Sequence, residues 1–442
     1  MRRIRPFLGI ILSILFVAVC LTPQVKTILC LPNSQKVVVG QTSLINIQLP
    51  HQLENKIEIK MLRPSQSVFA SPQDPPISIN HSISGYEITA LKPGKVNVEV
   101  KILGLIPIKS ITIESIPIRR VMPGGHSIGV VLQSQGIMVV GYAPVLGTDG
   151  KKSYPAKDQG VELGDVILQA DGQEVDSEED LARNIDEKKG QETVLQIKRK
   201  ERSIPISVRG IFCSETNRYR IGLYVRDGVV GVGTLSFWDP TTKEYGALGH
   251  IILDADTRQG INVRQGKIVT ASIQSIKPGV PGHPGEKIGI FGSQGKVQGS
   301  ISKNTYYGIF GQTVIDVQNP LTNGSVEVAY AHQVKVGKAQ MFTVINGEDI
   351  QAFDIVIEKL YPVSDNGKGM VVRITDPRLL SLTGGIIQGM SGSPIIQDSK
   401  IVGAITHVFL NDPSRGYGIY MDNMLSEMQN PEDQLKKVST NY

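Results

Sequence analysis

The sequence predicts a mainly β, multidomain protein. Short runs of apolar and β-branched residues, separated by Pro, Gly and Asn, recur along most of the chain, and strands bounded by such residues are typical of β-sandwiches and barrels. The 442 residues suffice for about three domains at roughly 150 residues each. Hydrophobic residues make up 40% of the chain and charged residues 20%, a balance that allows buried cores and argues against global disorder.

Charge and cysteine content argue against two classes of protein. The net charge of +5 is small for this length and aromatic residues make up only 5%, so nothing indicates a nucleic-acid-binding surface. Three cysteines are too few for a disulfide framework, since Cys20 and Cys30 lie in or beside the N-terminal apolar segment. We interpret Cys213 as a lone buried thiol.

The N-terminus has the pattern of an export signal. Basic residues within positions 2–5 precede an apolar stretch at 7–21, which is shorter than the ~20 residues that comfortably span a bilayer. Residues 18–20 offer only a poor cleavage site for a signal peptidase. Residues 1–34 are therefore predicted to be a signal peptide or a membrane anchor, with the basic end cytoplasmic and the rest of the chain exported.

Residues 35–118 predict a small β-sandwich-like spacer domain. Alternating β-prone runs such as 36–39 and 96–100 recur at the regular spacing of such a fold. His51 and His81 stand alone in polar segments, and no pattern of catalytic or metal-binding residues accompanies them. We therefore expect a spacer or docking role.

Residues 119–210 resemble a bacterial PDZ domain. A glycine-rich loop runs into a strand at Ser127-Ile128-Gly129-Val130, and the block AKDQGVELGDVI follows at 156–167. In PDZ domains free N–H groups of such a loop bind a chain-terminal carboxylate, while an exposed strand edge pairs with an extended peptide. The resemblance implies peptide binding by Ser127, Ile128, Gly129 and Val130. Ser177 is predicted to cap the helix that walls the groove.

A candidate nucleophile lies in Gly389-Met390-Ser391-Gly392-Ser393-Pro394. Glycines on a tight turn let the backbone approach a substrate and direct two N–H groups at one point. The motif resembles the Gly-x-Ser-Gly-x-Pro turn of chymotrypsin-like serine proteases, which implies that Ser391 is the nucleophile and that Gly389 and Ser391 form the oxyanion hole. Ser393 is the rival nucleophile and is interpreted as structural. An ordinary surface turn is the alternative for the motif taken alone.

His250 is the candidate general base. It follows Ala247-Leu248-Gly249 and precedes the serine in the chain, which resembles the position of the catalytic histidine in the same protease class. His407 lies just after the serine hairpin, where the wall of a substrate pocket is expected. His283 and His332 are the other competing histidines.

The acid of the triad is the least determined member. Asp376 follows a predicted strand at 369–374, from which its carboxylate could reach the histidine. It lies only 15 residues before Ser391, whereas chymotrypsin carries its acid far upstream. An Asp-Pro pair at the end of a strand also commonly forms a turn. The alternatives are Asp254, Asp256, Asp354 and Asp365.

The segment 211–442 is predicted to be a chymotrypsin-like double β-barrel domain. After Ser391 the sequence indicates a strand, a turn and a second strand at 394–404, and then a helix at 422–428, similar to the end of such domains. Glycine-rich stretches at 228–237 and 289–299 lack the spacing of a phosphate-binding loop and are interpreted as strands and bends.

Taken together, these segments resemble the S55 family of serine peptidases, of the stage IV sporulation protein B type. The resemblance covers nearly the whole chain and is strongest at 123–130, 222–250 and 374–418. It implies a catalytic triad of His250, Asp376 and Ser391, and it implies neither a metal ion nor an organic cofactor.

The resemblance also implies partners and a location. Members of this family are exported from the forespore into the intermembrane space during endospore formation, and the N-terminal segment would associate this chain with the membrane. They cleave themselves and then an extracytoplasmic inhibitor of an intramembrane metalloprotease, which triggers processing of a late mother-cell sigma factor precursor. The PDZ domain is implicated in self-recognition and in docking the target. Two alternatives stay open, a non-catalytic exported PDZ adaptor and a general secreted quality-control serine protease.

Overall fold

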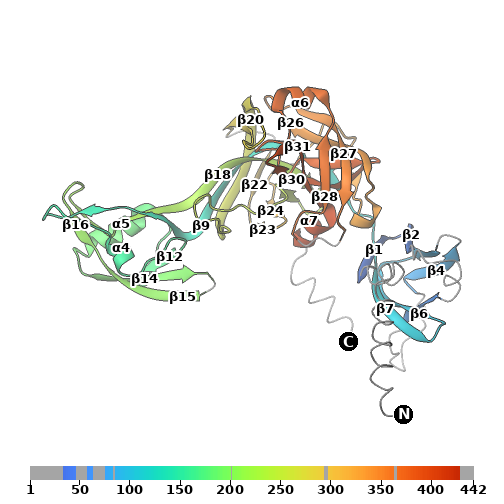
Figure 1. The fold of residues 1–442 in the computed structure, drawn as a ribbon, viewed down its shortest axis with the longest axis horizontal. Coiled ribbons are helices and arrows are strands. Elements are labelled where there is room, and N and C mark those ends of the chain that lie inside the picture. The colour runs from blue at the N-terminus through green and yellow to red at the C-terminus, as the bar shows by residue number, and fades with distance from the viewer. Residues whose placement is uncertain are drawn as a thin grey trace, which may run out of the picture. The chain divides into compact units, whose positions relative to one another are not determined.

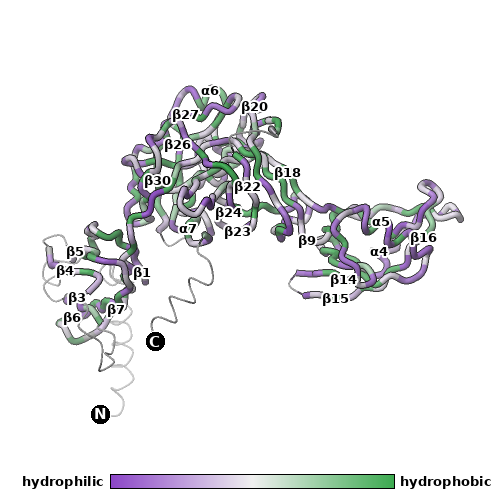
Figure 2. Tube along the Cα trace, turned by 180° about the vertical axis from the view of Figure 1, so that it is seen from behind, coloured by the Kyte–Doolittle hydropathy of each residue, from purple (hydrophilic) through white to green (hydrophobic). Residues whose placement is uncertain are grey.

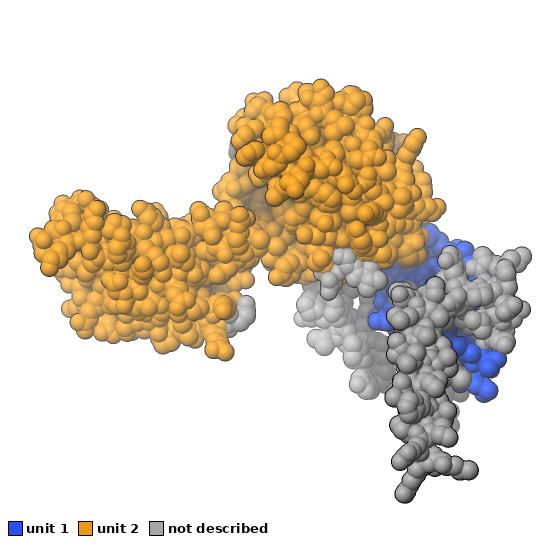
Figure 3. Space-filling view, viewed as in Figure 1, with its two compact units in different colours: residues 1–119 blue, residues 120–442 orange. Residues whose placement is uncertain are grey.

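The structure is a computed structural model that describes residues 33–45, 57–62, 75–82, 85–200, 202–292, 297–362 and 366–428. The predicted signal or anchor segment, 1–34, lies almost entirely outside these residues, as do Cys20, Cys30, His51 and Asp365. The described chain is mainly β, as predicted (Figure 1). It divides into two compact units, residues 1–119 and 120–442, which Figure 3 colours separately. Within the described ranges, no helix has the length and apolar character needed to cross a membrane.

Unit 1 holds two small sheets that share one apolar core. Buried side chains from both sheets, Val37, Ile88 and Ile111 among them, pack against one another. This sandwich-like arrangement agrees with the strand alternation of the sequence. One sheet has the order β1 (Ser34–Val38), β7 (Ile106–Ile116), β6 (Gly94–Ile102), β3 (Ile57–Leu62), and the other β2 (Thr42–Ile45), β5 (Gly85–Ala90), β4 (Ile77–Ser82).

Unit 2 ends in a closed six-stranded barrel, which we call the second lobe. Its interior is filled by apolar side chains such as Met341, Phe353 and Ile395, each fully buried. Between its strands lie the helix α6 (Pro377–Thr383) and the Ser391 turn. The predicted helix after the last strand is α7 (Met421–Met428), the last element that the structure describes. The barrel order is β26 (Gly337–Val344), β27 (Ile350–Leu360), β28 (Met370–Ile374), β31 (Asp412–Tyr420), β30 (Lys400–Phe409), β29 (Pro394–Gln397).

The first lobe precedes this barrel and has its own core, which includes Ile128, Leu235, Trp238 and Tyr245. Between the described residues, hydrogen bonds close the second lobe into a barrel, while the first lobe remains a sheet around its core. Parts of β9 (Ser127–Tyr142) and β18 (Leu223–Trp238) belong to it. Its other strands are β8 (Arg120–Pro123), β19 (Glu244–Ala247), β20 (Val263–Lys277), β21 (Glu286–Phe291), β22 (Gln298–Ser300), β23 (Lys303–Thr305), β24 (Gly308–Gln312) and β25 (Val326–Glu327).

Two long strands join the first lobe to the PDZ region. The N-terminal half of β9 pairs with β18 and β20 in the first lobe, and its C-terminal half pairs with β12 and with the start of β18 in the PDZ region. The PDZ region is thus inserted into the first lobe between the paired halves of β9 and β18. The sequence did not predict this arrangement, because the strands that pair with each half of β9 lie far away in the chain. The strand bends at Gly136, where φ is +77°.

The PDZ region combines short strands with two helices. Ser177 caps α5 as predicted, because its hydroxyl accepts a hydrogen bond from the Asp180 N–H at 3.1 Å. Alternate side chains of β14 are buried, and green and purple alternate along such strands in Figure 2. The elements are β10 (Val145–Leu146), β11 (Lys152–Ser153), α4 (Pro155–Asp158), β12 (Val166–Ala170), β13 (Gln173–Glu174), α5 (Glu178–Glu187), β14 (Glu192–Arg199), β15 (Arg202–Arg209), β16 (Ile211–Cys213) and β17 (Arg218–Arg220).

Candidate active site and peptide groove

The carbonyl groups of the Ser391 turn are anchored by the first lobe. The backbone N–H of Lys287 donates to the Gln388 carbonyl at 3.0 Å. Thr234 holds two further carbonyls, because its hydroxyl donates to Gly389 O at 2.7 Å and its N–H donates to Ser391 O at 3.0 Å. The turn that carries the candidate nucleophile is therefore oriented by contacts from outside its own lobe.

Two N–H groups of the same turn remain without a protein acceptor. Met390 N–H donates to Ile387 O and Gly392 N–H to Ile405 O, whereas the N–H groups of Gly389 and Ser391 donate to no atom of the described residues. The Met390 carbonyl accepts from the Ser393 N–H at 2.9 Å. Because the N–H and C=O of a trans peptide point in opposite directions, anchoring the carbonyls of Gln388 and Met390 fixes the N–H groups of Gly389 and Ser391. A pair of fixed, unpaired N–H groups beside a serine is the arrangement that stabilises an oxyanion.

Gly389 needs to be glycine at this position. Its φ is +92°, in the left-handed region, and a Cβ placed there would lie 3.1 Å from the Lys287 side chain. The Lys287 amine is itself buried and lies 2.7 Å from the Thr343 hydroxyl. Burial lowers the pKa of Lys287 to about 7.

The Ser391 hydroxyl is partly exposed and lies against β30. Its Oγ donates to the Thr406 carbonyl at 2.7 Å. Ser393, the rival nucleophile, is fully buried, and its hydroxyl has no hydrogen-bond partner in the described part of the chain. This burial favours the interpretation of Ser393 as a structural residue.

His250 follows a tightly wound loop after β19. Leu248 and Gly249 both have positive φ, at +68° and +72°, which turns the chain so that the imidazole lies near His407, with ring centroids 5.1 Å apart. His250 Nδ1 lies 2.9 Å from Ile251 O. In the tautomer that donates to this carbonyl, Nε2 is free to accept a proton. Burial lowers the pKa of His250, which keeps the ring neutral at neutral pH.

The residues at 405–407 of β30 are the common contact of the serine and histidine segments. Ser391 Oγ bonds Thr406 O, and a Cβ on Gly249 would lie 2.8 Å from the Thr406 methyl group. The structure therefore brings Ser391 and His250 to one strand, although the serine hydroxyl is hydrogen-bonded to Thr406 and not to His250. His407 lies where a pocket wall was expected, and burial lowers its pKa to about 4, with His250 and Lys368 adding to the shift.

The structure does not bring Asp376 to His250. The Asp376 carboxylate caps α6 by accepting from the N–H groups of Arg378 and Leu379, and it forms an ion pair with the Arg378 guanidinium at 2.7 Å. Its remaining contact is the Asp354 N–H, at 3.4 Å. The hydrogen bond to Arg378 lowers the pKa of Asp376 to about 2. In this conformation Asp376 performs the turn-forming role that its Asp-Pro sequence also allowed.

None of the alternative acids that the structure describes bonds to His250 either. Asp254 and Asp256 share Arg226 as their ion-pair partner, both at 2.7 Å. Asp354 accepts from the Gln340 amide at 3.1 Å. The backbone carbonyl of Ile251 is thus the one hydrogen-bond partner of the His250 ring among the described residues. Nor do three or more His, Cys, Asp or Glu side chains gather there into a group that could hold a metal ion.

The loop predicted to bind a peptide carboxylate is a strand in the structure. Ser127–Val130 form the start of β9, and they pair with Gly231–Thr234 of β18, while residues 128–130 also pair with Ile268–Thr270 of β20. All four residues are buried. Strand pairing on both sides leaves this segment neither the free N–H groups nor the open edge that a PDZ ligand needs. The expected loop is therefore corrected to a strand of the first lobe.

A groove with the required features lies instead between α5 and residues 221–225. Leu181 and Ile185 of α5 face Leu223 and Val225, which form the edge of the PDZ sheet. At one end, the N–H groups of Ile221 and Gly222 donate to no acceptor among the described residues. The φ of Gly222 is +74°, a conformation in which successive N–H groups can converge on an anion.

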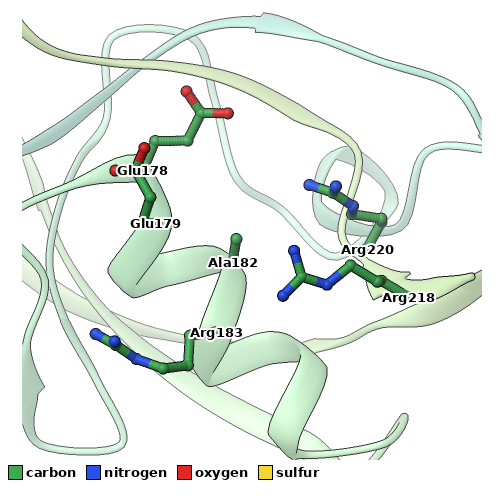
Figure 4. A pocket seen from close by; sticks show the side chains of 6 residues that line it. All are labelled: Glu178, Glu179, Ala182, Arg183, Arg218 and Arg220. Carbon is green, nitrogen blue, oxygen red and sulfur yellow. The ribbon is translucent and has the colours of Figure 1, made fainter. Parts of the chain in front are cut away.

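Two arginines lie beside this end of the groove. Figure 4 shows the guanidinium groups of Arg218 and Arg220 extending toward α5, where Ala182 and Glu178 line the same hollow of about 340 Å³. Asp186 fixes Arg218 at 3.1 Å. The sequence signal for this groove is the apolar-Gly-apolar run Ile221-Gly222-Leu223, preceded by Arg220.

Comparison with protein families agrees with this architecture. Residues 217–425 match the family model described as SpoIVB peptidase S55, and residues 128–209 match that of the PDZ domain. The chain thus carries a PDZ domain followed by an S55 serine peptidase domain. Its mainly β fold and its peptidase class, both predicted from the sequence, are confirmed.

Three solved structures with a partial likeness to this chain share little sequence with it. The active form of the Rv3671c protease from M. tuberculosis is 13% identical over 45% of this chain and 73% of that chain, with a TM-score of 0.24. Protease Anisep from Arthrobacter nicotinovorans is 13% identical over 44% and 84%, with a TM-score of 0.28. The thermostable serine protease AL20 from an extremophilic microorganism is 10% identical over 46% and 92%, with a TM-score of 0.29. No curated protein matches the sequence.

Proposed function

We propose that this S55 peptidase is a signalling endopeptidase, which cleaves its own chain and then an extracytoplasmic regulatory protein in a sporulation pathway. The observation that carries the catalytic part is the pair of fixed, unpaired N–H groups of Gly389 and Ser391 beside the serine hydroxyl. The signalling part rests on the family resemblance, in which the cleaved protein inhibits an intramembrane metalloprotease that processes a late sigma factor precursor.

In the proposed mechanism Ser391 is the nucleophile and His250 is the general base. The Ser391 hydroxyl leaves the Thr406 carbonyl, His250 Nε2 takes its proton, and Oγ attacks the scissile carbonyl carbon. The N–H groups of Gly389 and Ser391 bind the oxyanion. His250 then gives the proton to the leaving amine, and water hydrolyses the acyl-enzyme by the same steps in reverse roles. That Asp376 orients His250 stays a prediction, which its contact with Arg378 does not support.

The PDZ region is proposed to hold a carboxyl-terminal peptide in the groove between α5 and residues 221–225. The free N–H groups of Ile221 and Gly222 would bind the terminal carboxylate, and Arg218 and Arg220 would supply positive charge. The ligand is either the target protein or a segment of the chain itself. The proposed location is the space between the two forespore membranes, with export or anchoring by residues 1–34.

Self-cleavage of purified protein tests this function. Residues 35–442 are expressed as the parent, as Ser391→Ala and as Ser393→Ala, and the fragments are followed by electrophoresis over time. We expect Ser391→Ala to remain intact while Ser393→Ala is cleaved like the parent, provided that it folds. Self-cleavage of Ser391→Ala at the parental rate would remove Ser391 as the nucleophile, and a parent that neither cleaves nor reacts with a serine-directed phosphonate would favour the adaptor alternative.

A further inference from the structure

Thr234 on β18 bonds the Ser391 turn through two of its groups and the loop before His250 through a third. It is fully buried. Its hydroxyl donates to Gly389 O at 2.7 Å, its N–H donates to Ser391 O at 3.0 Å, and its carbonyl accepts from Leu248 N–H at 3.2 Å. Leu248 begins the loop that ends in His250. Thr234 thus connects the Ser391 turn to the loop that ends in His250.

The hydroxyl contact controls a peptide plane between the two oxyanion donors. The Gly389–Met390 peptide lies between the N–H of Gly389 and the N–H of Ser391, so its orientation sets the angle between them. On one side the plane is held by the Met390 N–H, which donates to Ile387 O at 3.1 Å. On the other side, the Thr234 hydroxyl is the one donor to this peptide among the described residues. Without that hydroxyl the Gly389 carbonyl would be buried against the first lobe with no donor.

The space around this contact leaves little room for another arrangement. A Cβ on Gly392 would lie 2.0 Å from Thr234 O and 2.5 Å from Leu248 N, which shows how closely the two lobes approach here. A Cβ on Gly389 would lie 3.1 Å from the Lys287 side chain, on the other side of the turn. Neighbouring atoms therefore confine the Ser391 turn, and the hydrogen bond from the Thr234 hydroxyl sets the direction of the Gly389 carbonyl within it.

We infer that the Thr234 hydroxyl is a positioning residue for catalysis, which sets the oxyanion hole by fixing the Gly389 carbonyl from the first lobe. The inference rests on the proposed role of Ser391 and extends it to a residue that touches neither substrate nor reacting atoms. Its contribution differs from that of a structural residue because the backbone N–H bond to Ser391 O survives any change of the Thr234 side chain. Loss of the hydroxyl should therefore affect turnover more than folding or substrate affinity.

The test compares Thr234→Val, which keeps the shape and removes the hydroxyl, with Thr234→Ser, which keeps the hydroxyl. The readouts are kcat and KM on a peptide substrate taken from the self-cleavage site, the rate of labelling by a fluorophosphonate, and the melting temperature. We expect Thr234→Val to lose about tenfold to a hundredfold in kcat, because a misdirected oxyanion donor costs about that much. KM should be nearly unchanged, and the melting temperature should fall by only a few degrees, because the Gly389 carbonyl is left buried without a donor. Thr234→Ser should restore most of the rate.

Two results would overturn the inference. The first is a kcat of Thr234→Val equal to that of the parent. The second is an equal loss of kcat in Thr234→Ser and Thr234→Val. Either result would show that kcat does not depend on the hydroxyl. If Thr234→Val fails to fold, Thr234→Ala carries the test, since it removes the hydroxyl without burying a new methyl group against the carbonyl. Ser391→Ala in the same labelling assay separates the two claims. Labelling that persists in Ser391→Ala contradicts the proposed function, whereas labelling lost there but unchanged in Thr234→Val contradicts only the role of Thr234.

Discussion

The Ser391 turn and residues 221–222 each present a pair of backbone N–H groups that have no acceptor within the described part of the chain, and the two places are built differently. At Gly389 and Ser391 the neighbouring carbonyls are held by Thr234 and by the Lys287 backbone. At Ile221 and Gly222 the N–H groups lie at the end of an apolar groove beside two arginines.

The difference matches the charge that each place is proposed to receive. An oxyanion exists only in the transition state, so its site must be oriented in advance and needs no permanent cation. A peptide carboxylate is charged throughout binding, and arginine side chains stabilise it in both the encounter and the complex. β18 begins beside the second place and passes the first at Thr234, so one strand contributes to both.

Gly389→Ala changes only the Ser391 turn and is expected to have the largest effect. Its φ of +92° is strained for alanine, and the added Cβ would lie 3.1 Å from the Lys287 side chain. We expect kcat to fall by about 10²–10³, the usual result of losing one oxyanion donor, while PDZ peptide binding is unchanged. Steady-state kinetics and a peptide titration on the same preparation check both halves. Equal kcat for variant and parent would contradict the assignment of this donor.

The reciprocal change is Arg220→Glu in the groove. Reversing this charge should weaken binding of a peptide with a free carboxyl terminus by about tenfold or more, because one charge-assisted contact becomes a repulsion. Turnover of a short substrate should not change. Fluorescence anisotropy with a labelled peptide measures the affinity, and Arg202→Glu on β15 is the matched control. An amidated peptide that binds as tightly as the free acid would show that the groove does not recognise a carboxylate.

Asp376→Asn separates a structural role from a catalytic one. The variant loses the charge that pairs with Arg378 and caps α6, so we expect the free energy of unfolding to fall by about 1–2 kcal/mol, with kcat of the folded enzyme largely retained. The pKa of Asp376, at about 2, lies below its unfolded value, so its contribution is present above pH ~4 and is lost as the pH falls through 2. Urea unfolding at several pH values measures this. A ~10⁴-fold loss of kcat at unchanged stability would instead establish Asp376 as the acid of the triad.

Lys287→Met changes the side chain that packs against Gly389 and gives the smallest expected effect. Burial lowers the pKa of Lys287 to about 7, so between that pH and its unfolded value near 10 the unfolded chain binds more protons. The stability of the parent should therefore rise with pH in this window, by at most about 1.4 kcal/mol per pH unit. Methionine keeps the apolar stem and removes this dependence. Parallel slopes for parent and variant in thermal unfolding from pH 7 to pH 10 would show that the amine is not buried in solution.

The secondary-structure elements and the serine turn could be predicted from the sequence because their signals are local. Glycine spacing around Ser391, the Ser177 cap and the alternation of β14 each depend on residues a few positions apart. The insertion of the PDZ region was not predictable in this way, because β9 and β18 are each continuous strands that change partners midway. The glycine pattern of Ser127–Val130 likewise predicts a peptide-binding loop. The segment is an interior strand because it pairs with the distant strands β18 and β20.

The acid shows a second limit of local reasoning. Asp376 and Arg378 are two residues apart, so their ion pair is visible in the sequence, but whether it competes with a contact to His250 depends on where α6 lies. Thr234 belongs to no motif, and its role depends on its contact with Gly389, which is 155 residues away in the chain.

The most direct test of the central claim is to locate the adduct of a fluorophosphonate on the intact enzyme by mass spectrometry after proteolysis. The account predicts a single modified residue, Ser391, with labelling that increases with pH as His250 loses its proton and that is abolished by His250→Ala. Because burial lowers the pKa of His250, the increase should be complete below the range of an ordinary histidine. An adduct on any other residue, or labelling of Ser391 at the parental rate in His250→Ala, would contradict the account.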